Sequence, residues 1–264
     1  MNRMREKQWG GFAVACVCVI ASGCRGNSIE REVFPSANDT AVYVLFDISG
    51  STNSAQVRES YLRDLDAIQG DLVSHGGVLR GDVIGSEALN TSTVPINVTF
   101  EPYDTFHKLQ TTDERHNKQI RDVTEALQKQ VKSTLDDAAP SSATAIMASL
   151  DFAAKILNGD QLRNAKRKAL IVFSDMIEES PQYNFTRENL TDSRIRAIVS
   201  AERAAGRLPD LHGVEVWKAG ASAEHLSDER SRQLQEFWIE YFKASGAELK
   251  ADHYGSTLLN FSLD

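Results

Sequence analysis

The spacing of hydrophobic and polar residues predicts strands that alternate with helices along most of the chain. Residues 42–46 form a continuous apolar run, which is typical of a strand buried on both faces. Similar runs predict strands at 169–174 and 213–217. Over 94–100 apolar residues alternate with polar ones, as in an edge strand that pairs with 78–86. Strands that alternate with helices indicate a mostly parallel sheet covered on both faces.

Apolar residues at helical spacing predict helices in the segments between these strands. The predicted helices cover about residues 54–74, 113–136, 144–157, 193–205 and 228–245. Gly76-Gly77 ends the first of them, and the second ends before Pro140. The last helix carries an apolar stripe that we expect to pack against the sheet, made of Leu234, Phe237, Trp238, Tyr241 and Phe242.

Oxygen-bearing residues follow the first predicted strand directly, in the sequence Asp47-Ile48-Ser49-Gly50-Ser51. Gly50 permits a tight turn that points both serine hydroxyls toward one place. Carboxylate and hydroxyl oxygens suit a hard divalent ion such as Mg²⁺ and suit zinc or copper poorly. The six histidines show no paired spacing that would support a zinc site. This loop is therefore the first candidate for a binding site.

The Asp-x-Ser-x-Ser sequence after the first strand resembles the metal-ion-dependent adhesion site (MIDAS) of the von Willebrand factor type A (vWA) domain. That family has two further ligands, and both have counterparts in this chain. Thr144 stands in a small-residue turn before an amphipathic helix, and Asp175 closes a second apolar strand run. The resemblance covers residues 40–250, and it departs from the family at Ser142-Ala143 and Met176, where glycines are common.

The resemblance implies a fold and a set of metal ligands. The fold would be α/β: a doubly wound, Rossmann-like vWA domain whose mostly parallel central sheet is flanked by helices and has one antiparallel edge strand. Strand order would reverse between the first strand and the strand that ends at Asp175, and ligands bind at such reversals. The implied ligands of Mg²⁺ or Mn²⁺ are Asp47, Ser49, Ser51, Thr144 and Asp175.

The resemblance also implies how such a site works. In this family the serines and the threonine tend to contact the ion directly, and the aspartates often act through water. Uncharged direct ligands leave the ion electron-poor, with one octahedral position open. A glutamate or aspartate of a protein partner fills that position. The implied chemistry is reversible adhesion or assembly, and we expect no enzymatic turnover.

Other interpretations of these residues stay open. Asp47 could be a helix N-cap, and the vWA-like site could be structural or vestigial. A phosphatase-like hydrolase with Asp47 as nucleophile is a third possibility, although that chemistry usually needs a second carboxylate where Ser49 stands. Glu178 and Glu179 follow Asp175 closely. We expect these glutamates to be solvated loop charges, with a position on the metal face as the alternative.

The N-terminus has the pattern of an export signal. Arg3, Arg5 and Lys7 precede an apolar stretch that is too short to span a membrane, and Ala21-Ser22-Gly23-Cys24 follows it. This segment resembles the bacterial lipoprotein box, in which the cysteine is lipidated and becomes the mature N-terminus. Its departure from that pattern is Ala21, which stands where leucine is usual.

Cysteine usage agrees with lipidation at Cys24. The chain has three cysteines, and Cys16 and Cys18 lie in the part that would be removed. Cys24 would then be the one thiol of an exported chain, and lipidation consumes it. We therefore expect three parts: a lipoprotein signal peptide at 1–23, a tether at 24–39 and the vWA domain at 40–264. A plain signal peptide with an incidental cysteine is the alternative.

Charge and composition narrow the expected partners. The chain is 41% hydrophobic and 25% charged, which is ordinary for a soluble globular protein. Its net charge is −8, and it becomes −10 for residues 24–264 because the removed segment carries three basic residues and one acidic residue. This negative net charge argues against nucleic acid and anionic lipid as ligands. The expected contacts are a protein partner and, through the lipid on Cys24, a membrane.

The residue after the lipidated cysteine bears on location. Arg25 stands there, and not the aspartate that retains many lipoproteins at the inner membrane. We therefore expect the protein in the bacterial cell envelope, at the outer membrane if the source has two membranes.

Overall fold

The computed structural model describes residues 37–50, 52, 54–85, 94–103, 111–138, 143–220, 226–258 and 261–263 of the 264-residue chain. All of them belong to one unit, Phe34–Asp264. The predicted signal peptide, Cys24, most of the predicted tether and Ser51 lie outside the described residues. In the described ranges, no helix has the length and the apolar character needed to cross a membrane.

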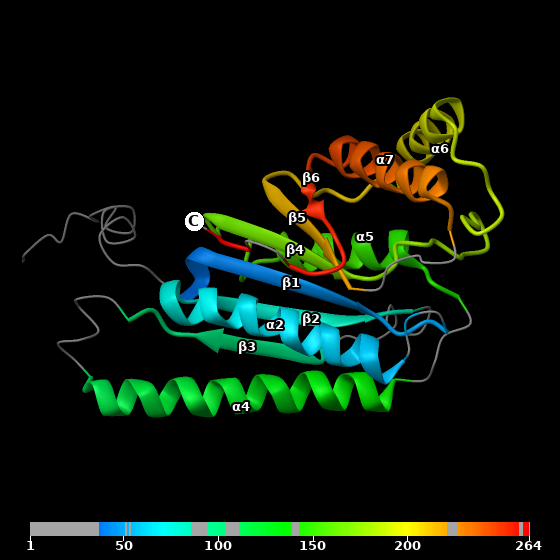
Figure 1. Cartoon of the computed structure of the whole chain (residues 1–264). Helices are drawn as coiled ribbons and strands as arrows, with labels where there is room; N and C mark the ends of the chain where they lie inside the picture. Colours follow the sequence, from blue (N-terminus) through cyan, green and yellow to red (C-terminus); the bar gives the residue numbers. More distant parts are fainter. Residues whose placement is uncertain are drawn as a thin grey trace, which may run out of the picture. The chain divides into compact units, whose positions relative to one another are not determined.

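A six-stranded sheet in the order β3-β2-β1-β4-β5-β6 forms the centre of the described structure (Figure 1). Its strands are β1 (Thr40–Asp47), β2 (Gly77–Ile84), β3 (Ile96–Phe100), β4 (Arg167–Phe173), β5 (Val214–Ala219) and β6 (Glu248–Tyr254). Neighbouring strands are parallel except β2 and β3, which are antiparallel. The predicted α/β fold, with a mostly parallel sheet and one antiparallel edge strand, is confirmed.

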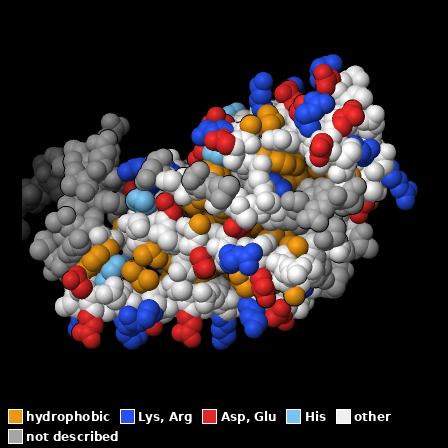
Figure 2. Space-filling model, in the orientation of Figure 1, with side chains coloured by type: hydrophobic (Ala, Val, Ile, Leu, Met, Phe, Trp, Pro, Cys, Tyr) orange, Lys and Arg blue, Asp and Glu red, His pale blue; other side chains and the backbone are white. Residues whose placement is uncertain are grey.

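Helices cover both faces of this sheet (Figure 1). One face carries α2 (Ala55–His75) and α4 (Asp113–Asp137), and the other carries α5 (Ile146–Leu157), α6 (Asp192–Ala204) and α7 (Asp228–Ala244). A short 3-10 helix, η1 (Ala37–Asp39), precedes β1. Figure 2 shows acidic and basic side chains interspersed along the lower edge of the view, where α4 lies. Among the described residues, this edge therefore carries no patch of purely acidic or purely basic side chains.

Residues of β1 alternate between the two faces of the sheet, and all of them are buried. Tyr43 and Leu45 pack in the core under α5, α6 and α7, whereas Val44 and Phe46 pack in the core under α2 and α4. Burial on both faces is the reason that 42–46 is a continuous apolar run. The predicted apolar stripe of α7 is confirmed as core, because all five of its side chains are buried.

Most of the helices begin at a polar side chain that accepts a backbone hydrogen bond. The caps of α2, α4, α6 and α7 are Ser54, Thr112, Thr191 and Ser227. The exception is α5, whose preceding residue Ala145 makes no side-chain cap. This helix begins at Ile146, so Thr144 lies before it and not within it as the predicted range 144–157 implied.

The strand β6 is not predicted by the sequence pattern. Leu249 and His253 are its buried residues, whereas Lys250 and Asp252 are exposed, so its hydrophobic periodicity is weak. It pairs in parallel with β5 and extends the sheet by one strand. The chain then returns to the other face of the sheet, where three side chains join the core under α2 and α4: Leu258, Phe261 and Leu263.

Candidate metal-binding site

The two predicted aspartate ligands meet at one edge of the sheet. Asp47 ends β1 and Asp175 follows β4, and these strands are neighbours at the point where strand order reverses. The predicted position of the reversal is confirmed. Both aspartates are buried, with 1% and 4% of their surface exposed. Burial, and then the charges of Asp47 and Asp175, raise the pKa of Tyr61, so both carboxylates act on the same hydroxyl.

The carboxylate of Asp47 is held by three hydrogen bonds. Its Oδ1 accepts from the backbone amide of Ser49 at 2.8 Å and from the hydroxyl of Thr52 at 3.1 Å. Its Oδ2 accepts from the hydroxyl of Ser174 at 2.7 Å. The N-cap of the following helix is Ser54, so the interpretation of Asp47 as that cap is wrong. Asp47 is instead a fixed acceptor beneath the loop.

The hydroxyls of the first loop gather around Asp47. Ser49 is buried, and its Oγ lies 3.3 Å from the Oγ1 of Thr52. The amide of Thr52 also donates to the carbonyl of Ser49 at 3.0 Å, which closes the turn. Ser51 lies outside the described residues. Thr52 was not among the predicted residues, although its position directly after Ser51 is the signal that would have indicated it.

Thr144 is tied to the loop that carries Asp175. Its amide donates to the carbonyl of Glu179 at 3.0 Å, and its carbonyl accepts from the amide of Glu179 at 2.9 Å. The two residues form an isolated antiparallel bridge, and Thr144 is buried. The structure therefore joins the second and third predicted loops by backbone hydrogen bonds and holds Thr144 in place without the use of its hydroxyl.

The expectation that Glu178 is a solvated loop charge is wrong. Glu178 is 1% exposed, and its Oε2 accepts from the amide of Met147 at 3.0 Å in the first turn of α5. It supplies the cap that this helix lacks in its own sequence, because free amides at a helix N-terminus favour an acidic acceptor. Burial raises the pKa of Glu178 to about 7. Glu179 is partly exposed, and its carboxylate accepts from the hydroxyl of Thr186 at 2.7 Å.

The backbone after Asp175 has an unusual conformation. Met176 has a φ of +65°, in the left-handed region where glycine is favoured, which gives a physical reason for the glycine common at this position of the family. Ser174 Oγ accepts from the backbone amide of Met176 at 2.8 Å, and Trp238 Nε1 donates to the backbone carbonyl of Met176 at 2.8 Å. The Oδ1 of Asp175 accepts from the amide of Ile177 at 3.0 Å.

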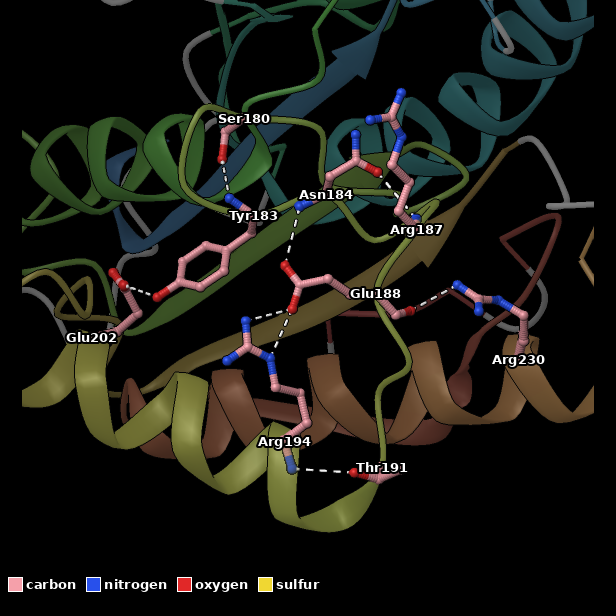
Figure 3. Close-up of polar contacts among 9 residues, drawn as sticks. All are labelled: Ser180, Tyr183, Asn184, Arg187, Glu188, Thr191, Arg194, Glu202 and Arg230. Carbon is pink, nitrogen blue, oxygen red and sulfur yellow. Dashed lines mark hydrogen bonds and ion pairs between the residues drawn. The ribbon is translucent and has the colours of Figure 1, made fainter.

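The rest of this loop is fixed to α6 and α7 (Figure 3). Arg230, in the first turn of α7, donates from Nη2 to the carbonyls of Phe185 and Glu188, at 2.9 and 2.8 Å. The carboxylate of Glu188 accepts from Arg194 Nε at 2.7 Å and from the amide of Asn184 at 3.3 Å (Figure 3). The loop after β4 is thus a packed structure that positions Asp175.

The donor set at this edge fits a hard cation. The buried carboxylates of Asp47 and Asp175 lie at the same edge of the sheet as the buried Ser49, and buried acids are stabilised by a compensating positive charge. Across the ranges that the structure describes, no three histidine, cysteine, aspartate or glutamate side chains are grouped as metal ligands. A cation here would therefore depend on hydroxyl oxygens beside the two aspartates, which suits Mg²⁺ or Mn²⁺.

Comparison with known proteins gives distant structural likenesses. No protein-family model matches this chain, and no curated protein matches it. The chain is similar to the pilus adhesin SpaC from Lactobacillus rhamnosus GG, in an open conformation, with 17% identity and a TM-score of 0.42 over 83% of this chain and 28% of that one. It is also similar to the manganese-loaded TRAP protein of Plasmodium vivax, with 16% identity and a TM-score of 0.38 over 84% and 70%.

A third similar structure is proximal thread matrix protein 1 from the mussel byssus, with 12% identity and a TM-score of 0.34 over 78% of this chain and 48% of that one. The chain thus spans less than two thirds of the pilus adhesin and of the byssus protein.

Proposed function

We propose that this chain is a vWA-type protein that binds a protein partner through a divalent metal ion. One observation carries the proposal: Asp47 and Asp175 meet where strand order reverses, and the Thr144 loop is bonded to the Asp175 loop. Three separate segments thereby converge on one edge of the sheet. This is the arrangement that the MIDAS resemblance of the sequence implies.

Mg²⁺ or Mn²⁺ is the proposed cofactor, and its proposed ligands are Asp47, Ser49, Ser51, Thr144 and Asp175. When bound, the ion would supply a positive centre with an open position for a carboxylate of the partner. The hydrogen bonds of Asp47 to Ser49, Thr52 and Ser174 suit a carboxylate that acts on the ion through water. Ser49 and Thr144 are the proposed direct ligands among the described residues.

Binding is a better interpretation of this site than catalysis. A nucleophilic aspartate needs a carboxylate oxygen that a substrate can approach. Both oxygens of Asp47 accept hydrogen bonds, and the residue is 1% exposed. We therefore propose an adhesion or assembly role, in which the partner presents a glutamate or aspartate. A folded but vestigial site is the alternative that the metal experiment below decides.

The proposed location rests on the N-terminal sequence. We propose that Cys24 carries a lipid and anchors the protein in the bacterial cell envelope, at the outer membrane if two membranes are present. The tether 24–39 would then place the domain away from the membrane surface.

Isothermal titration of the full chain with Mg²⁺ and Mn²⁺ tests the proposal. We expect weak binding, roughly micromolar to millimolar, to the wild type. Asp175→Asn should abolish this binding. The matched control is Asp151→Asn on α5, an exposed acid paired with Lys155, which should bind the ions normally. A folded wild type that shows no heat and no stabilisation with either ion would indicate a vestigial site. Stoichiometric zinc in the purified protein would also contradict the proposal.

A capture experiment extends this test to the partner. The wild type, Asp175→Asn and Asp151→Asn would each be used to capture proteins from an envelope extract, with Mg²⁺ or with EDTA. A partner bound through the metal should be retained by the wild type and by Asp151→Asn, and only when Mg²⁺ is present. Capture that persists in EDTA, or with Asp175→Asn, would mean that the partner does not bind through the metal.

A further inference from the structure

A pocket of about 630 Å³ adjoins the proposed metal site. Its lining residues come from the ends of β5 and β6, the segment after β6 and the first half of α7. Asp175 is part of its wall, so the pocket adjoins a proposed metal ligand. Its other described charged residues are Lys218, Arg232 and Asp228, and the polar residues Ser231 and Gln235 also line it. A pocket of this volume accommodates a small ligand or a few side chains.

Lys218 is a buried lysine in the wall of this pocket. It lies near the end of β5 and is 5% exposed. Its Nζ donates to the carbonyl of Gly255 at 2.9 Å and lies 5.2 Å from the centre of the Tyr254 ring. Burial lowers the pKa of Lys218 to about 8, and the charge of Asp175 opposes this shift. A buried ammonium group requires compensation by nearby anions or dipoles, and Asp175 is an anion whose charge acts on it.

A divalent ion at Asp175 would change this charge balance. The four described charged residues that line the pocket (Asp175, Asp228, Lys218 and Arg232) sum to zero, so a dication held by Asp47 and Asp175 leaves one positive charge in surplus, on the side of the site where Lys218 lies. Lys218 would therefore oppose binding of the metal alone. A single carboxylate placed between the metal and Lys218 would neutralise the surplus. Charges interact more strongly in a buried site than in water, so this neutralisation should change the affinity measurably.

We propose that this pocket receives the acidic side chain of the protein partner, and that Lys218 pairs with its carboxylate while the metal ion binds the same group. This inference rests on the proposed function and adds a role for a residue outside the metal-ligand set. Its consequence is coupling: the metal binds weakly by itself and more tightly when a carboxylate is present. The coupling is reciprocal, because the metal must tighten binding of the carboxylate by the same factor as the carboxylate tightens binding of the metal.

The test uses acetate as a probe for the carboxylate and the full chain at pH 6.5. Mn²⁺ affinity is measured by isothermal titration with saturating acetate and with chloride at equal ionic strength, after correction for the binding of Mn²⁺ to acetate in buffer. For the wild type we expect acetate to tighten Mn²⁺ binding by at least about five-fold. Lys218→Met should bind Mn²⁺ alone several-fold more tightly than the wild type, and acetate should change its affinity little.

Two further variants separate the role of charge from that of structure. Lys218→Arg keeps the positive charge and should retain the acetate effect. Lys250→Met makes the same change at an exposed lysine of β6 that pairs with Glu215, and it should behave as the wild type. Thermal unfolding in EDTA reports whether each variant is folded. Should Lys218→Met not fold, Lys218→Gln provides the same charge removal with a polar side chain.

The outcomes are distinguishable. Lys218→Met has two predicted effects of opposite direction, tighter metal binding alone and a smaller acetate effect, and a merely damaged site would show both affinities weakened. Mn²⁺ binding without an acetate effect in the wild type, or an acetate effect unchanged by Lys218→Met, overturns this inference and leaves the proposed function standing. A wild type that binds no Mn²⁺ with or without acetate overturns both.

Discussion

The indole nitrogen of Trp238 donates a hydrogen bond to the backbone carbonyl of Met176, and the two atoms are 2.8 Å apart. Met176 follows the proposed ligand Asp175 and is held at a positive φ of 65°. Non-glycine residues in this region are costly and persist where the surroundings fix them. Trp238 belongs to the apolar stripe of α7, so the core of the protein and the proposed metal loop are joined at this residue.

Trp238→Phe should destabilise the protein while it keeps an aromatic ring in the core. The substitution removes the donor and leaves the carbonyl of Met176 buried without that hydrogen bond, which costs about 1–3 kcal/mol. The measurement is urea unfolding in EDTA. Tyr241→Phe on the same helix is the control, because within the described part of the chain the buried Tyr241 hydroxyl has no hydrogen-bond partner. We expect that variant to be as stable as the wild type or more so. Equal losses in both variants would contradict this role of Trp238.

Thr144→Ala should weaken metal binding and leave the fold intact. The hydrogen bonds that join Thr144 to Glu179 are made by the backbone, and alanine keeps them. Loss of one direct oxygen ligand should reduce metal affinity by about 1–3 kcal/mol, comparable to a charged group left short of a hydrogen bond. The measurements are Mn²⁺ titration and thermal unfolding in EDTA. A large fall in melting temperature with unchanged affinity would show that Thr144 is structural.

Glu178→Gln should reduce the dependence of stability on pH. Burial disfavours the charged form and raises the pKa of Glu178 from its ordinary value of 4.5 to about 7 in the folded protein. A raised carboxyl pKa stabilises the fold at low pH, and this contribution is lost as the pH rises through 7. The wild type should therefore lose up to about 3 kcal/mol of unfolding free energy between pH 4.5 and pH 8 from this group.

Glutamine keeps an acceptor for the amide of Met147 and does not titrate, so Glu178→Gln should lack this loss. Urea unfolding of both proteins at pH 5 and pH 8 in EDTA measures the difference. Burial raises the pKa of Asp82 to about 6, but this residue is present in both proteins, so its contribution to the pH dependence cancels in the comparison. The same pH dependence in the two proteins would mean that Glu178 is not the group responsible.

Cys24→Ser should abolish membrane anchoring and leave the domain folded. The proposed lipid is attached to this cysteine, and a serine hydroxyl cannot form the thioether. Mass spectrometry of the mature N-terminus and fractionation of cells test the prediction. Cys18→Ser, within the segment that would be removed, is the control and should be lipidated normally. An unmodified Cys24 in the wild type, or cleavage at another position, would rule out the anchor.

The sequence by itself determined most of the secondary structure and the location of the candidate site. Strand and helix periodicities act over a few residues, and so do helix caps such as Ser54, so short windows of sequence contain the information. The meeting of Asp47 and Asp175 followed from the strand order that the vWA resemblance implied, because the carboxyl ends of adjacent parallel strands lie at one edge of a sheet. The strand β6 was missed, because two buried residues among exposed charges make too weak a pattern.

Only the tertiary structure decided what surrounds the site. Trp238 lies 62 residues from Met176 in the chain, and Glu178 lies 31 residues from Met147. A charged residue is solvated or buried according to what packs over it, and a local pattern contains no information about that packing. For this reason the sequence predicted a solvated loop charge at Glu178 and gave no indication that Lys218 is buried. Both side chains become buried only when distant segments pack over the ends of the strands.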